Sequence, residues 1–321
     1  MTDTHTPTTA LVPYLGHGTD GADAWLRMHP SDRRRAAMQA ARERNDATLW
    51  SLTEAWTRTF TRAGADIAEG TVRNYKRGVA QLIAAWRDED LLRPAPDAAT
   101  SYVRHLQTRG LTPGTIATRL AAARGLYAAL RWARACPLDP FRDVHAPHDP
   151  TPPWEKRHPY DDDELAALLA AATDPCDRAL VLLGAHAGLR AGECVALCWH
   201  DVHLARRDVR VRQGKGGKTR TVAISATLTQ ALRAVPRAAD GYVLPYRTNT
   251  SAWRRMRRLC DRAGVSPKGM HSLRRSAGTR LFAETGDLET TARHLGHARL
   301  DTTRIYAKWS DRRLRETIGR W

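Results

Sequence analysis

Cysteines are few in this sequence, and long apolar segments are missing from it. Its 321 residues include five cysteines, an odd number that does not make a paired disulfide framework and that fits a reducing compartment. No segment approaches the roughly 18 consecutive apolar residues that a membrane-spanning helix requires. The segment from Met1 to Pro13 has no basic region followed by an apolar one, so it does not read as a secretory signal. We therefore expect a cytoplasmic protein without a membrane partner.

The sequence also lacks a recognisable metal-ligand pattern. Cys194, Cys198, His200 and His203 are close together, but their C-x3-C-x-H-x2-H spacing is not one of the usual zinc-ligand arrangements. Both cysteines are expected on the buried side of one helix. The chain has neither a phosphate-binding P-loop nor a carboxylate cluster. We therefore expect no metal site.

Acidic residues are too few to balance the basic ones. The chain has 34 Asp and Glu against 51 Lys and Arg, which gives a net charge of +17 and an isoelectric point near 10.4. The excess is largest over residues 251–321, with 17 Arg or Lys and 7 Asp or Glu. Such a charge indicates a polyanionic partner, most often nucleic acid. An arginine-rich composition imposed by a GC-rich genome is the alternative explanation.

Helical periodicity dominates the first half of the chain. Residues 1–45 are interpreted as a partly disordered N-terminal extension, with no fixed structure over 1–21 and a basic segment after it that is either a helix or solvated chain. Over residues 46–145, apolar side chains recur at helical spacing and predict a bundle of four or five helices. Basic residues on its exposed positions are suited to gripping the phosphates of a duplex, although an ordinary solvated face is the alternative. These residues are Arg73, Lys76, Arg77, Arg119 and Arg124.

Prolines separate this bundle from a second predicted domain. Seven of them lie between residues 137 and 159, so residues 146–160 are interpreted as an interdomain linker and 161–321 as the second domain. That domain is mostly helical, with short β segments at 202–204, 208–213 and 219–224. The last two flank Gly214–Lys218, which is typical of a hairpin turn. The predicted fold class is mainly α with a small antiparallel β-sheet.

Several residues of the second domain suggest phosphate chemistry. His271 and Arg274 are three positions apart on a predicted helix, so they share a face and can reach one anion. Arg190 lies just after a glycine that ends a helix. Tyr306 lies nine residues after His297, within a basic stretch. Taken singly, each has a simpler structural interpretation, such as a capping arginine, an interior histidine or a core aromatic residue.

In their order along the chain, these motifs resemble the tyrosine recombinase (phage integrase) family, in particular its Xer-type members. The resemblance covers roughly residues 46–321. It is strongest over Gly188–Glu193, Gly214–Lys218, His271–Arg274 and Leu295–Tyr306. It implies an N-terminal helical core-binding (SAM-like) domain and a C-terminal tyrosine recombinase catalytic domain.

The resemblance also implies how the scissile phosphate would be held. Arg190 and Arg274 would clamp its non-bridging oxygens, because a guanidinium group donates two hydrogen bonds at once and stays charged. Glu193 would orient these cations. Lys215 would protonate the departing 5′ oxygen, and Lys218 is the less favoured candidate for that role.

The remaining matched residues would carry out the attack. Tyr306 would be the nucleophile, and it needs help because a free phenol has a pKa of about 10. His271 would help to accept its proton, and His297 would hydrogen-bond the phosphate. Arg275 stands where the family often has histidine; we assign it, with Lys218, to DNA contact.

These roles imply a site-specific recombinase that forms a 3′-phosphotyrosyl intermediate and exchanges strands between two sites. Its partners would be double-stranded DNA with inverted-repeat sites and three further subunits, in a homo-tetramer or a hetero-tetramer with a paralogue. Chromosome-dimer resolution and integration or excision are both compatible with this chemistry. The phosphotyrosine conserves the bond energy, so no cofactor is expected. The alternatives are a type IB topoisomerase-like nicking-closing enzyme and a non-catalytic DNA-binding relative.

Overall fold

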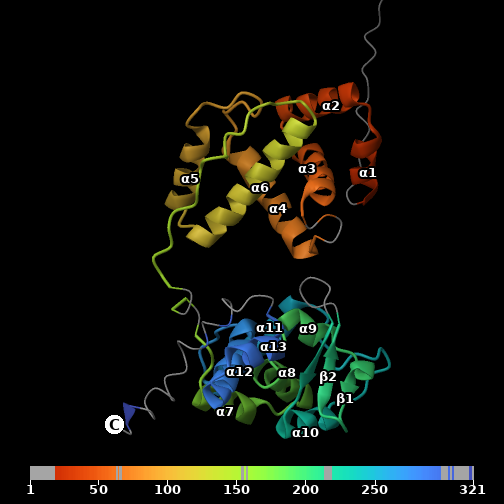
Figure 1. The fold of residues 1–321 in the computed structure, drawn as a ribbon, viewed down its shortest axis with the longest axis vertical. Coiled ribbons are helices and arrows are strands. Elements are labelled where there is room, and N and C mark those ends of the chain that lie inside the picture. Colours follow the sequence, from red (N-terminus) through yellow and green to blue (C-terminus); the bar gives the residue numbers. More distant parts are fainter. Residues whose placement is uncertain are drawn as a thin grey trace, which may run out of the picture. The chain divides into compact units, whose positions relative to one another are not determined.

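The structure, a computed structural model, divides into two compact units, Met1–Pro150 and Thr151–Trp321 (Figure 1). It describes residues 19–62, 64, 67–152, 155–156, 158–212, 219–297, 303, 306 and 318–319. The division falls within the segment predicted to be a linker. No helix in these ranges is long and apolar enough to cross a lipid bilayer.

Helices make up the regular structure described for the first unit. Prolines and side-chain caps start several of them: Thr112 accepts a hydrogen bond from the Thr115 amide, directly before Pro113. Asn45 caps the helix that begins at Asp46 in the same way, through the Thr48 amide at 3.0 Å. The helices are α1 (Thr19–Arg27), α2 (Pro30–Arg42), α3 (Asp46–Phe60), α4 (Glu69–Ala85), α5 (Ala98–Thr108) and α6 (Pro113–Trp132).

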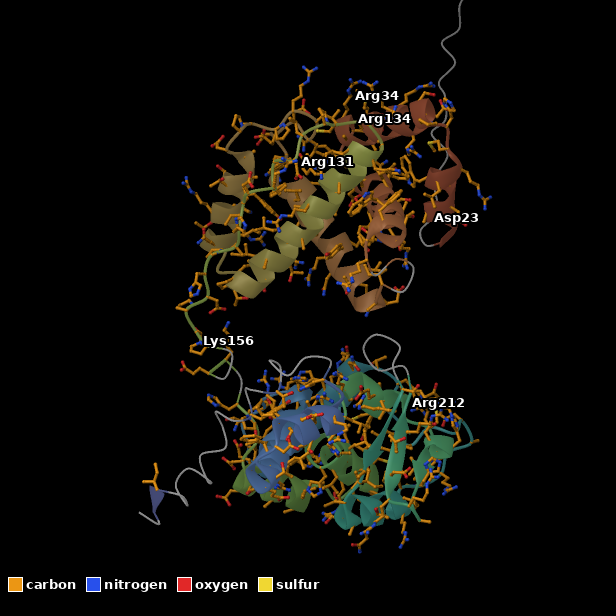
Figure 2. The ribbon with its side chains drawn as sticks, in the orientation of Figure 1. Asp23, Arg34, Arg131, Arg134, Lys156 and Arg212 are labelled. Atoms are coloured by element: carbon orange, nitrogen blue, oxygen red, sulfur yellow. The ribbon has the colours of Figure 1, made fainter. Side chains whose placement is uncertain are left out.

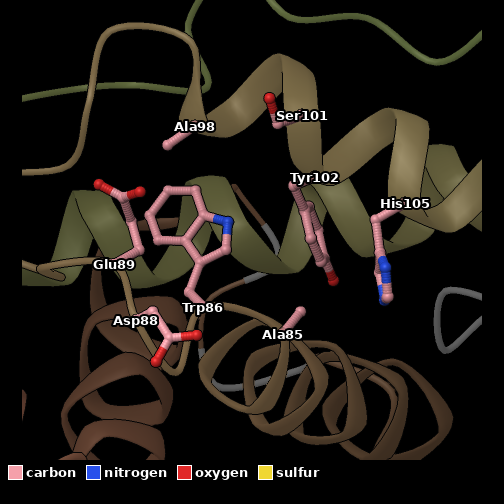
Figure 3. Close-up of a pocket in the computed structure, with 8 residues that line it drawn as sticks. All are labelled: Ala85, Trp86, Asp88, Glu89, Ala98, Ser101, Tyr102 and His105. Carbon is pink, nitrogen blue, oxygen red and sulfur yellow. The ribbon is translucent and has the colours of Figure 1, made fainter.

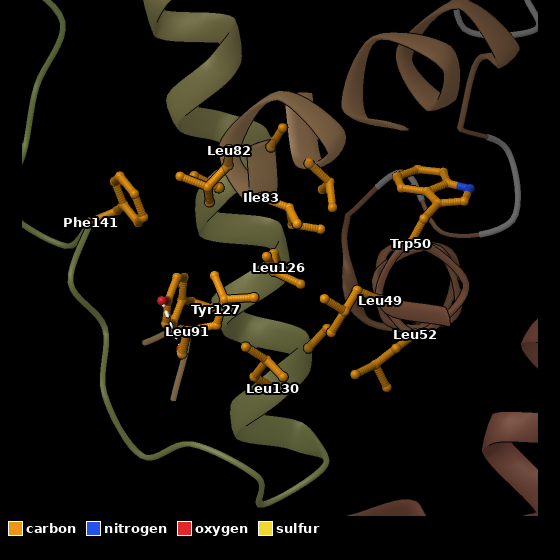
Figure 4. Packing of buried hydrophobic residues seen from close by; sticks show 14 of the residues in the cluster. Leu49, Trp50, Leu52, Leu82, Ile83, Leu91, Leu126, Tyr127, Leu130 and Phe141 are labelled. Atoms are coloured by element: carbon orange, nitrogen blue, oxygen red, sulfur yellow. Dashed lines mark hydrogen bonds between the residues drawn. The ribbon is translucent and has the colours of Figure 1, made fainter. Parts of the chain in front are cut away.

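Helix α6 is at the centre of this unit and packs against both α3 and α4 (Figures 1 and 4). Gly78 of α4 permits this approach, since a Cβ atom there would lie 2.5 Å from that of Ala122 on α6. At the edge of the core, Trp86 stacks on Phe141 with ring centroids 5.4 Å apart. The hydroxyl of the buried Tyr127 donates to the Leu91 carbonyl at 2.9 Å. Leucines and aromatic rings therefore form one continuous core.

Part of the predicted N-terminal extension belongs to this core. Trp25 of α1 is fully buried, and its indole N–H donates to the Ser51 hydroxyl of α3 at 3.1 Å. Burial of an indole ring with its N–H satisfied stabilises the ordered helix. The expectation that residues 1–21 lack fixed structure is therefore wrong for 19–21, because α1 begins at Thr19, and residues 1–18 lie outside the described part of the chain. The basic segment is helical, as α2.

A cavity of about 290 Å³ opens in the first unit between the C-terminal end of α4 and helix α5 (Figure 3). Trp86 and Tyr102 form apolar walls, and His105 and Asp88 are among the other lining residues. None of the residues that line it belongs to the predicted catalytic set.

The second unit combines helices with a three-stranded antiparallel sheet in the order β1-β2-β3. The predicted fold class, mainly α with a small antiparallel sheet, is confirmed. In the register, Val202 pairs with Val209 and Val211 with Arg220. The strands are shorter than predicted, and the hairpin residues 213–218 lie outside the described ranges. The elements are α7 (Asp162–Ala171), α8 (Pro175–Ala185), α9 (Ala191–Ala196), η2 (Trp199–Asp201), β1 (Val202–His203), β2 (Asp208–Val211), β3 (Arg220–Ala223), α10 (Ala226–Ala234), α11 (Asn249–Ala263), α12 (Met270–Thr285) and α13 (Leu288–Leu295).

Two features fix helix α8, which leads into the predicted site. Gly184 lets α12 approach closely, because a Cβ atom there would lie 2.6 Å from the Cβ of Leu273. At the other end of α8, the fully buried Asp177 accepts hydrogen bonds from Arg255 at 2.5 and 2.7 Å and from Arg262 at 3.1 Å, both on α11. The end of α8 is thereby held beside the start of α12, where His271 and Arg274 lie.

Candidate active site

Arg190 lies at the junction between α8 and α9. Gly188, at a φ of +65°, turns the chain there, and a Cβ atom on it would lie 2.4 Å from the Leu295 side chain. Arg190 then caps α9, and both its amide and its guanidinium group donate to the Glu193 carboxylate at 2.8 Å. The glycine therefore sets the path of the backbone, and the glutamate sets the direction of the arginine.

Arg274 is fully buried on α12, one turn after His271. Its two terminal nitrogens donate to the carbonyls of Gly188 at 2.5 Å and Leu295 at 2.6 Å, which follow α8 and end α13. Burial, together with the charge of Arg190, lowers the pKa of Arg274 to about 10. The group is thus still cationic at neutral pH, and two of its five N–H groups are directed at carbonyls.

Glu193 is surrounded by cations. Arg220 of β3 donates one hydrogen bond to each of its oxygens at 2.8 Å, in addition to the bonds from Arg190. An Arg274 nitrogen lies 4.0 Å away. Burial would raise the pKa of Glu193, but hydrogen bonds from Arg220 and Arg190 lower it to about 2. At neutral pH, one carboxylate is therefore shared by three guanidinium groups, and the cluster is positive.

Tyr306 and His297 lie against each other in this cluster. Their rings are nearly parallel, with centroids 5.9 Å apart and an interplanar angle of 10°. Gly278 of α12 provides the space for the phenol, since a Cβ atom there would be 2.6 Å from the tyrosine Cζ. The Tyr306 side chain is only 2% exposed. Burial raises the pKa of Tyr306, although the charges of Arg274 and Arg275 act in the opposite direction.

His297 follows Gly296, the left-handed residue that ends α13. One of its ring nitrogens lies 3.0 Å from the Thr303 hydroxyl. Burial, together with the charges of Arg274 and Arg190, lowers the pKa of His297 to about 4. The ring is therefore neutral at pH 7 in the protein without DNA.

The structure brings most of the predicted catalytic residues together. His271 is exposed, and its charge contributes to the low pKa of His297, which places the two rings in the same neighbourhood. Arg275 is half-buried, and its charge acts on Tyr306. Lys215 and Lys218 lie outside the described residues. The roles predicted for all of these residues stay predictions.

Arg220 is a residue of this cluster that the sequence analysis missed. It shares one face of β3 with the buried Val222, two positions on, because side chains alternate along a strand. An arginine on the buried face of a strand needs a carboxylate or other hydrogen-bond acceptors nearby, and this is the signal that could have identified it.

The predicted DNA-contact residues of the first unit differ in exposure. Arg73, Lys76 and Arg77 are exposed on α4, as expected. Arg119 was expected on an exposed face, but it is only 8% exposed and donates to the Asn74 carbonyl, because α6 is enclosed by its neighbours. Arg124 is half-buried, and it donates to the carbonyls of Phe141 and Val144. Other basic side chains lie at the surface, such as Arg34 on α2 (Figure 2).

The cysteines and histidines near α9 are separated by the end of that helix. Cys194 is buried on α9, but Cys198 is half-buried beyond the last helical residue, Ala196, so the expectation that both lie on one helix is wrong. His203 is paired with Asp208 at 2.8 Å. Within the described ranges, no group of three or more His, Cys, Asp or Glu side chains could hold a metal ion.

Comparison with known proteins identifies this architecture. Residues 160–313 match the phage integrase family, and residues 54–134 match the N-terminal SAM-like domain of phage integrases. Tyrosine recombinase XerC of Xanthomonas campestris pv. campestris (strain B100) is 31% identical over 257 residues, which cover 75% of this chain and 79% of XerC. Tyrosine recombinase XerD of Halalkalibacterium halodurans is 25% identical over 286 residues, 81% and 94% of the two chains.

Solved structures show the same fold. XerH site-specific recombinase, bound to a palindromic difH substrate after cleavage, has a TM-score of 0.61 at 16% identity, over 93% of this chain and 95% of XerH. A lambda integrase dimer bound to a COC′ core site has a TM-score of 0.63 at 16% identity, over 80% and 76% of the chains. The matches define an enzyme that breaks and rejoins DNA strands. The chain belongs to the tyrosine recombinase (phage integrase) family.

Proposed function

We propose that this recombinase exchanges strands between two specific DNA sites and that Tyr306 is its nucleophile. The observation that carries the proposal is the position of the phenol, buried against His297 and within the field of Arg274 and Arg190. A phosphate group that entered this cluster would meet preplaced cations on one side and the phenol on another.

Arg190 and Arg274 hold the non-bridging oxygens of the scissile phosphate. When phosphorus becomes five-coordinate, its equatorial oxygens gain negative charge, and cations already in position stabilise that charge without reorganising. The carbonyls of Gly188 and Leu295 fix the plane of the Arg274 guanidinium. Glu193 fixes Arg190 in the same way. The clamp is therefore ordered before DNA binds.

The attack requires two proton transfers. The raised pKa keeps Tyr306 protonated at neutral pH, so a base must accept its proton as the bond from the phenol oxygen to phosphorus forms. His271 takes this proton at the exposed edge of the site, and the neutral His297 donates a hydrogen bond to the phosphate. As the bond from phosphorus to the 5′ oxygen breaks, Lys215 supplies the proton for that oxygen. Attack by a 5′ hydroxyl from the partner duplex reverses these steps.

The substrate is double-stranded DNA with inverted-repeat sites. Arg73, Lys76 and Arg77 on α4 contact its backbone, because their exposed cations displace counterions from phosphates. Among similar folds, lambda integrase is known as a dimer on a core site and as a tetramer on a Holliday junction. We extend this to a tetramer of the present protein, acting on DNA in the cytoplasm, in dimer resolution or in integration and excision.

The test is the formation of a covalent adduct on a nicked suicide duplex. The site is first selected by binding from a library of random inverted repeats. Wild-type protein should give a protein–DNA adduct that survives denaturing electrophoresis, and Tyr306→Phe should give none. No adduct from the wild type, or an adduct from Tyr306→Phe, contradicts the proposal. An adduct without recombination between two sites would favour a topoisomerase instead.

A further inference from the structure

Arg220 connects the sheet to the phosphate clamp. It is the first residue of β3, and its guanidinium group forms a two-pronged contact with Glu193, with both nitrogen–oxygen distances at 2.8 Å. Its side chain is 14% exposed, and that of Glu193 is 7% exposed. A fork-to-carboxylate contact fixes the orientation of both groups as well as their separation.

The stem of Arg220 also lies directly against the segment that carries His297. A Cβ atom on Gly296 would be 2.6 Å from the Arg220 Cδ and 2.8 Å from its Nε. Glycine at this position therefore makes room for the arginine. The Gly296 carbonyl in turn lies 3.4 Å from an Arg190 nitrogen. Arg220 thus touches the acid that orients Arg190 and the backbone that precedes His297.

Other arginines of the sheet do not have this environment. Arg206, between β1 and β2, is 66% exposed and pairs with Asp208 at the surface. Arg212, after β2, is 52% exposed and pairs with Asp201 (Figure 2). Both of these guanidinium groups are more than half exposed, although the Asp201 carboxylate is buried. A pair with an exposed arginine, such as Arg206 with Asp208, contributes little, whereas loss of one partner of a pair buried on both sides leaves the other charge uncompensated.

We infer that Arg220 is a positioning residue for DNA cleavage, which acts through Glu193 to keep Arg190 available to the scissile phosphate. The inference rests on the proposed function. With Arg220 in place, the Glu193 carboxylate accepts hydrogen bonds from two guanidinium groups, so its negative charge offsets only part of the field of Arg190. Without it, Glu193 neutralises Arg190 more completely and draws it away from the phosphate. The stem of Arg220 also supports Gly296 and hence the position of His297.

The experiment compares Arg220→Met, Arg220→Lys and the surface control Arg206→Met on two suicide duplexes. One carries an ordinary scissile phosphate, and the other a methylphosphonate, in which one charged oxygen is replaced by a methyl group. Single-turnover adduct formation is measured at saturating protein. Because a neutral centre needs less cationic stabilisation, a weakened clamp should matter less on the second substrate.

On the phosphate, Arg220→Met should cleave about 10- to 100-fold more slowly than the wild type, the size of loss typical when a group that orients a metal ligand is removed. On the methylphosphonate, this deficit should fall below about threefold. Arg220→Lys keeps the charge but not the fork, so its deficit should be intermediate on the phosphate. Arg206→Met should cleave both substrates at the wild-type rate.

The outcomes separate this inference from the proposed function. An equal deficit on both substrates means that Arg220 only supports the fold, and an unchanged rate means that it has no role; either result overturns the inference alone. If Arg220→Met does not fold, the ratio of the two deficits in Arg220→Lys decides the question. If the wild type forms no adduct on either duplex, the proposed function fails and the inference fails with it.

Discussion

Replacement of Gly278 by alanine should lower the cleavage rate of this protein without a matching loss of stability. The added Cβ would lie 2.6 Å from Cζ, 2.7 Å from Cε1 and 2.9 Å from Cε2 of the Tyr306 ring. Carbon atoms in contact are ordinarily about 3.5–4.0 Å apart, so the phenol must move by roughly 1 Å. A misplacement of that size can reduce a rate about 100-fold. In contrast, alanine in a helix interior is favoured over glycine by roughly 0.5–1 kcal/mol.

Gly278→Ala should therefore lose about 100-fold in single-turnover adduct formation without a matching loss of stability. The rate is measured on the suicide duplex, and stability by urea denaturation. Gly114→Ala is the matched control, since no atom lies within 4 Å of the Cβ added in α6, and it should cleave at the wild-type rate. If Gly278→Ala cleaves as fast as the wild type, the phenol does not need its present position, and the geometry assigned to the site is wrong.

Three further substitutions test other features. Asp177→Asn should lower the free energy of unfolding by about 3 kcal/mol, the lower end for a broken buried ion pair, because its arginine partners stay partly exposed. The pKa of Glu193 is lowered to about 2 in the folded protein. The ionised carboxylate therefore contributes its full stabilisation above the pKa of the unfolded state, and this stabilisation is lost as the pH falls toward 2. The difference in unfolding free energy between wild type and Glu193→Gln should accordingly shrink from pH 5 to pH 2. Arg77→Met should weaken DNA binding and reduce by about 1 the steepness with which the logarithm of the binding constant falls against the logarithm of the salt concentration (the salt slope). Arg119→Met, at a buried position, should leave this slope unchanged.

Each of these results has an outcome that contradicts it. Asp23→Asn is the control, because it breaks an exposed ion pair and should change the free energy of unfolding by less than about 1 kcal/mol. If Asp177→Asn lowers the free energy of unfolding by no more than Asp23→Asn does, the burial of Asp177 does not strengthen its ion pairs. A stability difference at Glu193 that is constant from pH 5 to pH 2 would exclude the lowered pKa. An unchanged salt slope in Arg77→Met would remove α4 from the DNA contact surface.

The sequence predicted the features that depend on local spacing. His271 and Arg274 share a helical face because they are three residues apart, and the β segments on either side of the predicted turn at Gly214–Lys218 correspond to β2 and β3. The family resemblance gave a meaning to the nine-residue spacing between His297 and Tyr306. These patterns predicted the fold class, because helix and strand periods are fixed by backbone geometry, whereas only the family resemblance implied that the candidate residues share one site.

Features that depend on contacts between distant segments were not predictable in this way. Arg119 has the spacing of an exposed residue but is enclosed by neighbouring helices. Trp25 donates a hydrogen bond to Ser51, which lies 26 positions away in the chain, and Arg220 donates to Glu193, which lies 27 positions away. Gly278 could be recognised as necessary only once the Tyr306 ring was placed beside it. In each case, the tertiary neighbour decides the role of the residue.

The buried position of Arg274 also affects how this lineage can evolve. Its side chain satisfies the carbonyls of Gly188 and Leu295, so a replacement without N–H donors would remove the donor of each, at about 1–3 kcal/mol per carbonyl. Tyr306→Phe, in contrast, removes only one hydroxyl group. Descendants that abandon the chemistry but keep the fold should therefore lose the tyrosine first and retain the arginine. In such a relative, a conserved arginine at this position would reflect its structural role and would not be evidence of catalytic activity.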